Sequence, residues 1–391
     1  MVTELHKKLA DLETVVSQDE PIVSVYVSPG SAFGAGRAVS AQLHGLLERI
    51  EAESATSDRG ARMAVRDAID RIRQMQPRIA AAAGKTVALF VGGHPALNEF
   101  IILPESAWDV ATIGLRPYLR PYRAALGYFH TLATVLADPR QTEISVTYMG
   151  EVLDKATINT SPIRKAVIGG WHGLDEHRSR NRTEEIHTRH YREVADRLGR
   201  LVQDHGVEAI FAGGREEAIA ELLGQMGEPL TRLVAGTFTA DLHTTTPASL
   251  AQTTAELEEG YEQRLADSLI TTTLELARAH GLATAGLADT AAAANLGAID
   301  QLIVAGTSME PGWMCRACGW LSLTGPQCPG CGQDAEQLSD LIDALVAKAQ
   351  SQGAAIKHVR FPSKLDEEKV AARLRFSPTP AGAAIPEEAT T

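Results

Sequence analysis

Four cysteines, the only ones in the chain, form two Cys-x-x-Cys pairs. The first pair, CRAC, contains Cys315 and Cys318, and the second, CPGC, contains Cys328 and Cys331, with nine residues between the pairs. Two thiolates two residues apart on a tight turn can hold one side of a tetrahedral Zn²⁺, and a second pair completes the shell. Because four thiolates leave no position open for water, this spacing predicts a structural zinc site rather than a catalytic one.

Two other interpretations of the cysteine pairs predict different chemistry. Two disulfides would require an oxidising compartment, and a redox Cys-x-x-Cys motif normally occurs once, beside a βαβ unit. The spacing favours zinc over both. Gly319, Gly330 and Gly332 agree with zinc, because they follow the pairs closely, where a zinc knuckle needs a positive φ angle.

The segments on both sides of the cysteines predict an α/β/α unit, with a zinc ribbon at 312–333 inserted after a strand. Before the ribbon we expect a helix and then a strand, at 287–296 and 301–305. After the ribbon we expect a helix, a strand and a last helix, at 335–350, 355–361 and 365–374.

Composition places the chain among globular proteins of two or three domains, with 391 residues, 44% hydrophobic and 22% charged. The polar start lacks the apolar core of a signal peptide, and no run of about 18 apolar residues predicts a membrane span. We therefore expect a cytoplasmic protein without membrane contact. A reducing compartment again favours metal over disulfides.

The charge of the chain is uneven. The net charge of −12 argues against general nucleic-acid binding. Between residues 164 and 200, however, nine Arg and Lys stand against six Asp and Glu, so this segment carries +3 and the rest of the chain −15. A local basic patch on an acidic protein can meet RNA at one place.

The N-terminal region, 1–125, is predicted to be an α/β domain. Its expected helices and strands lie at 3–16, 22–27, 39–53, 59–83, 86–91 and 99–103. The RPYLRPY segment at 116–122 is interpreted as an interdomain linker, and RNA contact through Tyr118, Tyr122 and the arginines is the alternative.

The middle region, 126–240, is predicted to contain a ribonuclease-H-like sheet, and the whole chain is of mixed α/β class. We expect three meandering strands, a long helix, a strand, a helix and a strand, at 131–137, 143–148, 152–158, about 182–204, 207–212, 216–226 and 230–238. Gly213 and Gly214 follow a strand, and we interpret them as a tight turn rather than a phosphate cradle.

The C-terminal domain, 241–378, opens with an amphipathic helix at 250–280, and the tail, 379–391, is expected to be disordered.

The C-terminal pattern resembles a known superfamily. The order LGAIDQLIV (296–304), zinc ribbon, helix, GAAIKHV (353–359) and EEKVAARLRF (367–376) is similar to the C-terminal domain of archaeal and eukaryotic class-1 peptide release factors and their Pelota relatives. Archaeal members carry a zinc mini-domain at the same insertion point, and the middle domain of release factors has the ribonuclease-H-like fold. The bacterial branch of this superfamily includes Balon-like ribosome hibernation factors.

The segment RTEEIHTRHYREVADRL (182–198) is similar to the long helix that follows the catalytic Gly-Gly-Gln loop of release factors. In the corresponding loop, 169–181, Trp171 stands where the glutamine would follow the two glycines, and the chain contains neither Gly-Gly-Gln nor the stop-codon-reading Asn-Ile-Lys-Ser sequence. The hydrolytic role therefore does not carry over, and no catalytic residue is assigned.

The loop keeps residue types that suit RNA contact by backbone approach, stacking and phosphate binding. The candidate RNA-binding residues are Gly169, Gly170, Trp171, His172, Arg178, Arg180 and Arg182. A surface loop with solvated arginines is the alternative. Histidines also gather here, but His172, His177, His187 and His190 lack metal-site spacing, so we expect them to be exposed or capping residues.

The resemblance implies a binding protein that occupies the ribosomal A site and contacts rRNA of the A site and the peptidyl-transferase centre. Without the codon-reading and hydrolysing motifs, such a protein would act in hibernation or stress protection, and a translational GTPase is a further candidate partner. One alternative is a ribosome-rescue peptidyl-tRNA hydrolase that uses other loop residues, such as His172 or Asp175. Another is an RNA-binding or assembly protein that acts through the C-terminal domain, a domain type similar to kink-turn RNA binders.

Overall fold

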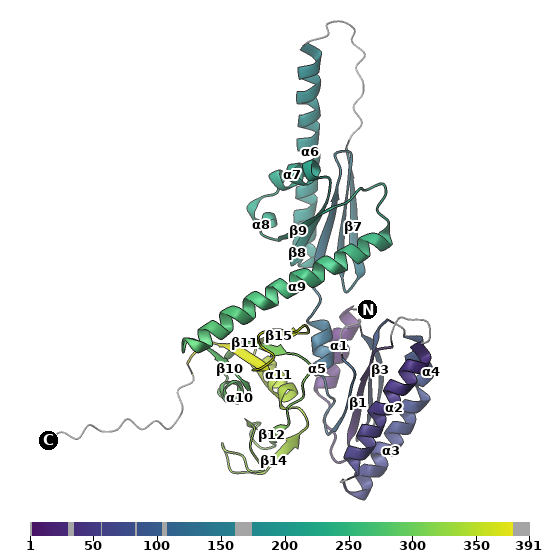
Figure 1. Ribbon diagram of the computed structural model, residues 1–391, viewed down its shortest axis with the longest axis vertical. Helices are drawn as coiled ribbons and strands as arrows, with labels where there is room; N and C mark the ends of the chain where they lie inside the picture. Colours follow the sequence, from purple (N-terminus) through teal and green to yellow (C-terminus); the bar gives the residue numbers. More distant parts are fainter. Residues whose placement is uncertain are drawn as a thin grey trace, which may run out of the picture. The chain divides into compact units, whose positions relative to one another are not determined.

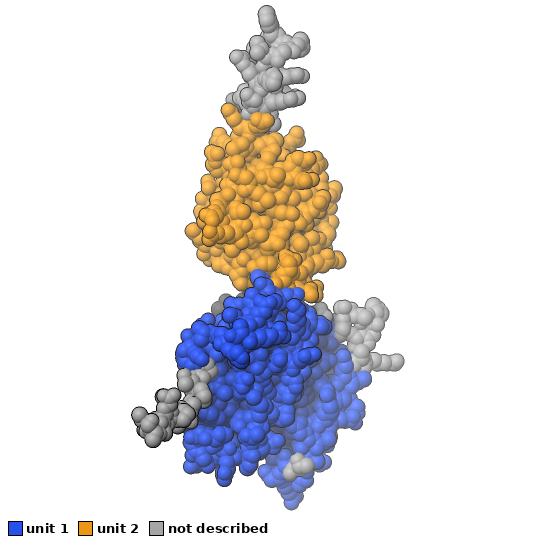
Figure 2. Space-filling model, turned by 60° about the vertical axis from the view of Figure 1, so that its left-hand side comes forward, with its two compact units in different colours: residues 1–128, 265–391 blue, residues 129–264 orange. Residues whose placement is uncertain are grey.

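The computed structural model describes residues 2–29, 35–55, 57–82, 84–103, 108–160 and 174–377. The chain divides into two compact units, which Figure 2 shows in different colours. One unit combines Met1–Tyr128 with Leu265–Thr391, and the other is Phe129–Arg264. The boundaries at 125 and 240 between three domains stay a prediction, because this division separates compact units rather than domains.

The N-terminal part of the first unit is an antiparallel sheet in the order β3-β2-β1-β4 (Figure 1). Its strands are β1 (Ile22–Val27), β2 (Thr86–Gly92), β3 (Leu97–Leu103) and β4 (Val110–Gly114). The helices are α1 (Val2–Glu13), α2 (Ala35–Ser54), α3 (Arg59–Gln74) and α4 (Gln76–Ala81). Strand β1, IVSVYV, is buried along its whole length, as expected for a central strand, and its valines pack against apolar residues of α2 and α3.

Three details of this region differ from the sequence predictions. The helix predicted at 59–83 is two helices, with Met75 between them and Pro77 at the start of α4, where proline is tolerated. Strand β4 was not predicted. The predicted linker at 116–122 runs into helix α5 (Arg120–Leu126), in which Arg120 and Tyr122 are buried. Because Tyr118 is also only 5% exposed, RNA contact through these residues is ruled out by burial.

The C-terminal part of the first unit is a four-stranded sheet in the order β10-β16-β11-β15. Its strands are β10 (Ala283–Ala285), β11 (Ile299–Ala305), β15 (Ala355–Val359) and β16 (Val370–Leu374). Helices α10 (Leu287–Asn295) and α11 (Leu341–Ser351) pack on one face, and the C-terminal half of α9 (Pro247–Arg278) packs on the other. The predicted α/β/α layering is therefore confirmed.

Two helices predicted in this region differ from the structure. One begins later than predicted, and the other is not a helix. Residues Ala335–Leu338 form strand β14, because they pair with β12 (Gly312–Cys315), and helix α11 begins only at Leu341. The helix predicted at 365–374 is wrong: its first half forms turns, and Val370–Leu374 form strand β16, which lies between β10 and β11 and is antiparallel to both.

The ribbon is a small antiparallel sheet in the order β13-β12-β14, with β13 at Leu321–Ser322. It is inserted between β11 and α11, as predicted.

The second unit has a five-stranded sheet in the order β7-β6-β5-β8-β9. Its strands are β5 (Leu132–Ala137), β6 (Gln141–Tyr148), β7 (Glu151–Asn159), β8 (Ala209–Gly214) and β9 (Val234–Thr239). The first three are antiparallel, and β8 and β9 run parallel to β5, as in the predicted ribonuclease-H-like sheet. The strand predicted from 230 starts only at Val234, because helix α8 (Glu228–Thr231) precedes it.

Helices cover both faces of this sheet. Helix α6 (Leu174–His205) packs on one face through Tyr191, Val194 and Leu198, together with α7 (Glu216–Gln225). On the other face, Leu257 and Tyr261 of α9 pack against Leu132 and Phe211.

Candidate functional site

The four cysteine sulfurs meet at one end of the ribbon, and all four Sγ atoms lie within 4.8 Å of one another. The Sγ atoms of Cys315 and Cys331 are 3.5 Å apart, and those of Cys318 and Cys328 are 3.6 Å apart. A tetrahedral Zn–S₄ centre places its sulfurs about 3.8 Å from one another, whereas a disulfide bond is about 2.05 Å long. The arrangement fits a metal ion and excludes disulfides, so both halves of the predicted site come together.

The backbone around the cysteines forms two matching turns. The N–H of Gly319 donates to the carbonyl of Cys315, and the N–H of Gly332 donates to that of Cys328, both at 2.9 Å. Gly319 and Gly332 have φ angles of 68° and 73°, as predicted for zinc knuckles. Gly330 does not have a positive φ. A Cβ there would lie 2.9 Å from the ring of Trp320, so close packing explains this glycine.

The local electrostatics favour a thiolate at Cys315, whereas at Cys318 and Cys331 backbone donors are outweighed by hydrogen bonds among the sulfurs, which raise the pKa of both thiols. Backbone N–H donors, that of Cys318 first and then that of Ala317, lower the pKa of Cys315 to about 6. A thiolate is the form that binds a metal ion. The donor set suits zinc, which would hold the two knuckles together and leave no position for a substrate.

The ribbon is tied to the α/β/α layers by polar side chains. The side-chain amide of Asn295 on α10 accepts from the N–H of Leu321 at 2.9 Å and donates to its carbonyl at 2.8 Å. On α11, the ammonium of Lys348 donates to the carbonyl of Gly319 at 2.7 Å and to the Asn295 side chain at 2.9 Å. The end of the ribbon that carries the cysteines is therefore fixed to two helices.

The predicted RNA-binding residues are only partly described by the structure. Gly169, Gly170, Trp171 and His172 lie outside the described residues. Arg178, Arg180 and Arg182 lie in the first turns of α6, where the backbone is described and the side chains are not. Their contact with RNA stays a prediction.

Two of the histidines on α6 have protein partners. His190 is buried, its Nε2 lies 2.9 Å from the Thr142 hydroxyl, and burial lowers its pKa. His187 lies 3.5 Å from a carboxylate oxygen of Glu221. The expectation of an exposed or capping residue is wrong for His190, because that residue faces the sheet.

A second polar cluster surrounds His130 in the second unit and was not predicted. The imidazole Nδ1 lies 2.9 Å from Glu208, and Nε2 lies 2.7 Å from Glu262. The backbone N–H of His130 donates to Glu258 at 2.9 Å. Burial lowers the pKa of His130, but hydrogen bonds to Glu208 and Glu262 outweigh it and raise the pKa to about 9.

One signal for this cluster is present in the sequence. Glu258 and Glu262 are four residues apart on the predicted helix at 250–280, so they share a face. Nothing local indicates His130 as their partner, because it lies more than 100 residues away.

A third cluster joins the two ends of the chain within the first unit. The guanidinium of Arg120, fully buried, donates to Asp340 at 3.1 Å and to the carbonyls of Gly306 and Ser308 at 3.0 and 2.6 Å. The Tyr118 hydroxyl donates to the same Asp340 carboxylate at 2.9 Å. The RPYLRPY segment thus holds the N-terminal sheet to the start of α11.

Residues 117–259 match the sequence profile of bacterial archaeo-eukaryotic release factor family 10. Over these residues the chain is similar to that family, in agreement with the release-factor resemblance predicted from the sequence.

Relatives of known sequence include the uncharacterised protein Rv2629 of Mycobacterium tuberculosis H37Rv. It is 25% identical over 308 residues, which cover 75% of this chain and 77% of the relative. Its counterpart in strain CDC 1551, MT2704, matches equally.

Solved structures with a similar arrangement have low sequence identity. The archaeal translation termination factor aRF1 is 15% identical, with 96% of this chain and 98% of that chain covered and a TM-score of 0.26. Dom34 of S. cerevisiae is 10% identical, with 76% and 81% covered and a TM-score of 0.39. Similarity at this level concerns the fold alone.

None of the helices in the described ranges has the length and apolar character that crossing a membrane requires.

Proposed function

We propose that the protein binds the ribosome as a release-factor-like translation factor and occupies the A site without promoting codon-dependent peptide release. The observation that carries this proposal is the match of residues 117–259 to the bacterial release factor family, over the unit that bears the long helix α6. The absence of Gly-Gly-Gln and Asn-Ile-Lys-Ser argues against termination. Protection of idle ribosomes during hibernation or stress is then the role we assign.

In the proposed complex, the residues before and at the start of α6 contact RNA. Helix α6 has 32 residues, and its C-terminal two-thirds supply the core residues Tyr191, Val194 and Leu198. The cations Arg178, Arg180 and Arg182 precede this packed part in sequence. Cationic side chains are suited to phosphate contact, and Trp171 is suited to stacking on a base. A translational GTPase that delivers the protein completes the proposal.

Cosedimentation with ribosomes at several salt concentrations tests the RNA contact. Replacing Arg178, Arg180 and Arg182 with alanine should weaken binding most at low salt, and the salt slope should flatten by about one for each phosphate that is no longer neutralised. Replacing Trp171 with alanine should weaken binding with little change in the slope, because the variant removes stacking rather than charge.

A matched control removes three exposed arginines from the same helix. Arg189, Arg192 and Arg200 are exposed, so their replacement with alanine removes the same charge without disturbing the core. Unchanged affinity in the first triple variant, or an equal loss in both, would remove the loop from the interface. Failure of the wild-type protein to cosediment with ribosomes from growing or starved cells would overturn ribosome binding.

A peptide-release assay separates hibernation from rescue. Purified protein added to ribosomes that carry peptidyl-tRNA should release no peptide, with or without a stop codon in the A site. Release that needs no stop codon and is lost in His172→Ala or Asp175→Ala would instead establish a rescue hydrolase.

A further inference from the structure

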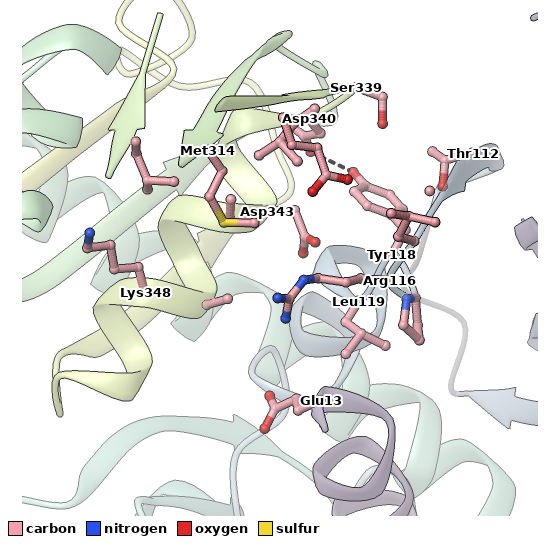
Figure 3. A pocket seen from close by; sticks show the side chains of 18 of the residues that line it. Glu13, Thr112, Arg116, Tyr118, Leu119, Met314, Ser339, Asp340, Asp343 and Lys348 are labelled. Atoms are coloured by element: carbon pink, nitrogen blue, oxygen red, sulfur yellow. Dashed lines mark hydrogen bonds between the residues drawn. The ribbon is translucent and has the colours of Figure 1, made fainter. Parts of the chain in front are cut away.

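A cavity in the first unit has a volume of about 470 Å³, within the range of small-molecule sites (Figure 3). One side is formed by the end of α1 and the segment that follows β4, which carries Arg116 and Leu119. The other side is formed by the ribbon and α11, which carry Met314, Asp343 and Lys348. The cavity therefore lies between the two sheets of this unit, beside the metal-binding end of the ribbon.

Each carboxylate that lines the cavity has an arginine partner. Arg123 pairs with Glu13 at 3.1 Å and with Asp343 at 3.0 Å. Asp340 pairs with Arg120 at 3.1 Å, and Glu336 pairs with Arg316, also at 3.1 Å. Three arginines thus serve four carboxylates, because Glu13 and Asp343 share Arg123.

The cations that line the cavity are not balanced in the same way. Within the described part of the chain, Arg116 makes no hydrogen bond or ion pair through its side chain, and the residue is exposed. Lys348 donates only to neutral acceptors, the carbonyl of Gly319 and the amide of Asn295. Burial lowers the pKa of Lys348, and the neighbouring sulfurs of Cys318 and Cys328 oppose this. Among the described cations that line the cavity, Arg116 is therefore the one whose side chain has no hydrogen-bond or ion-pair partner.

We infer that this cavity binds a small amphipathic carboxylate, with its anionic end on Arg116 and its apolar part against Leu119 and Met314. A planar guanidinium binds a carboxylate through two parallel hydrogen bonds. A single unpaired guanidinium matches one carboxylate, whereas a doubly charged phosphate would add a second negative charge to a cavity that Glu13 and Asp343 also line. The site does not depend on the proposed ribosome contact, because it uses no residue of the second unit.

Ligand-observed NMR titration of the full-length protein tests the site with three compounds of one skeleton. 4-Phenylbutyrate should bind saturably, with a dissociation constant on the order of millimolar for a ligand of this size. 4-Phenylbutan-1-ol and 4-phenylbutylamine should bind at least about tenfold more weakly, because each lacks the charge-assisted hydrogen bonds to Arg116. Tighter binding of phenethyl phosphate than of 4-phenylbutyrate would overturn the assignment to carboxylates.

Two variants locate the binding. Arg116→Met removes the charge without removing any described contact, and Ala347→Phe fills the cavity from α11 without changing the charge. Both should lower the affinity for 4-phenylbutyrate at least about tenfold. Arg49→Met, a change at an exposed arginine on α2 away from the cavity, should leave the affinity unchanged. Binding that survives Arg116→Met, or that falls equally in Arg49→Met, would overturn the proposal.

Discussion

At the scale of single residues, the described side chains with clear chemical roles depend on partners that the fold brings to them. Cys315 meets Cys331 across the ribbon, and His130 meets Glu262, which is 132 residues away. Their chemistry therefore depends on the fold around them, and each of the two sites has a property that can be measured directly.

We expect one zinc ion per chain, bound by the four cysteines. Cys328→Ser should abolish stoichiometric zinc, because three thiolates and a serine hydroxyl make a much weaker site. Binding of a structural zinc supplies on the order of 10 kcal/mol to the fold around it, so the ribbon should unfold while the sheet that contains β11 and β16 remains. Metal analysis and hydrogen exchange of the two regions check this. Wild-type protein with free thiols and no zinc would contradict it.

We expect His130 to titrate near pH 9 rather than near 6.5, because Glu208 and Glu262 stabilise its charged form. A raised pKa contributes stability that is fully present below about pH 6.5 and is lost as the pH rises through about 9. The stability advantage of the wild type over His130→Gln should therefore shrink over this range, by up to about 3 kcal/mol. NMR titration of the imidazole and urea unfolding at several pH values measure both quantities. A His130 pKa near 6.5 would contradict the prediction.

At the scale of helices and strands, the sequence predicts most of the elements whose pattern of apolar residues agrees with their burial against neighbouring elements. Strand β1 begins and ends at the predicted residues, 22 and 27, because its six residues are continuously buried. Strand β16, VAARL, consists largely of helix-forming residues, and pairing with β10 and β11 overrides this local preference. Strand β14, AEQL, is determined in the same way by pairing with β12.

The candidate site residues differ in the same way: a local sequence pattern indicates some of them, and long-range contacts determine the others. Cysteine spacing is a local property, so it predicted which four side chains come together. Partners such as Asp340 for Arg120, 220 residues apart, carry no local pattern. The charged cluster at His130 and the cavity at Arg116 depend on such long-range contacts, and for that reason neither was predicted.

The end of strand β8 allows a test of close packing at the scale of one element. A Cβ on Gly213 would fall on the ring of Phe238 and lie 2.9 Å from Leu136. Gly213→Ala should therefore destabilise the second unit, by about 1–3 kcal/mol. Gly224→Ala, in α7 with no atom near the added Cβ, should stabilise the unit by up to about 1 kcal/mol. Denaturant unfolding of both variants checks the pair, and equal stability would contradict the role of close packing at Gly213.

At the scale of the whole molecule, one buried ion pair joins sequence regions that the second unit separates. Arg120→Met should leave the Asp340 carboxylate buried without its cation, at a cost of about 3–5 kcal/mol. In this variant, the contact between residues 1–128 and residues 265–377 should loosen, and the residues at this contact should become accessible to protease. Arg116→Met, four residues earlier and exposed, should change stability by less than about 0.5 kcal/mol and serves as the control. Equal protease resistance of the two variants would show that Arg120 does not stabilise this contact.

The first unit consists of two segments that are separated in the sequence. Its folding can therefore be completed only after the second segment has been synthesised. Residues 1–128 leave the translating ribosome long before their partner segment, and Arg120 must wait for Asp340, 220 residues further along the chain. At about 5–20 residues per second, this delay is roughly 10–45 s. The second unit, which is continuous in sequence, can fold within that interval. A nascent chain stalled before Asp340 would therefore present the buried surface of Tyr118 and Arg120 to chaperones.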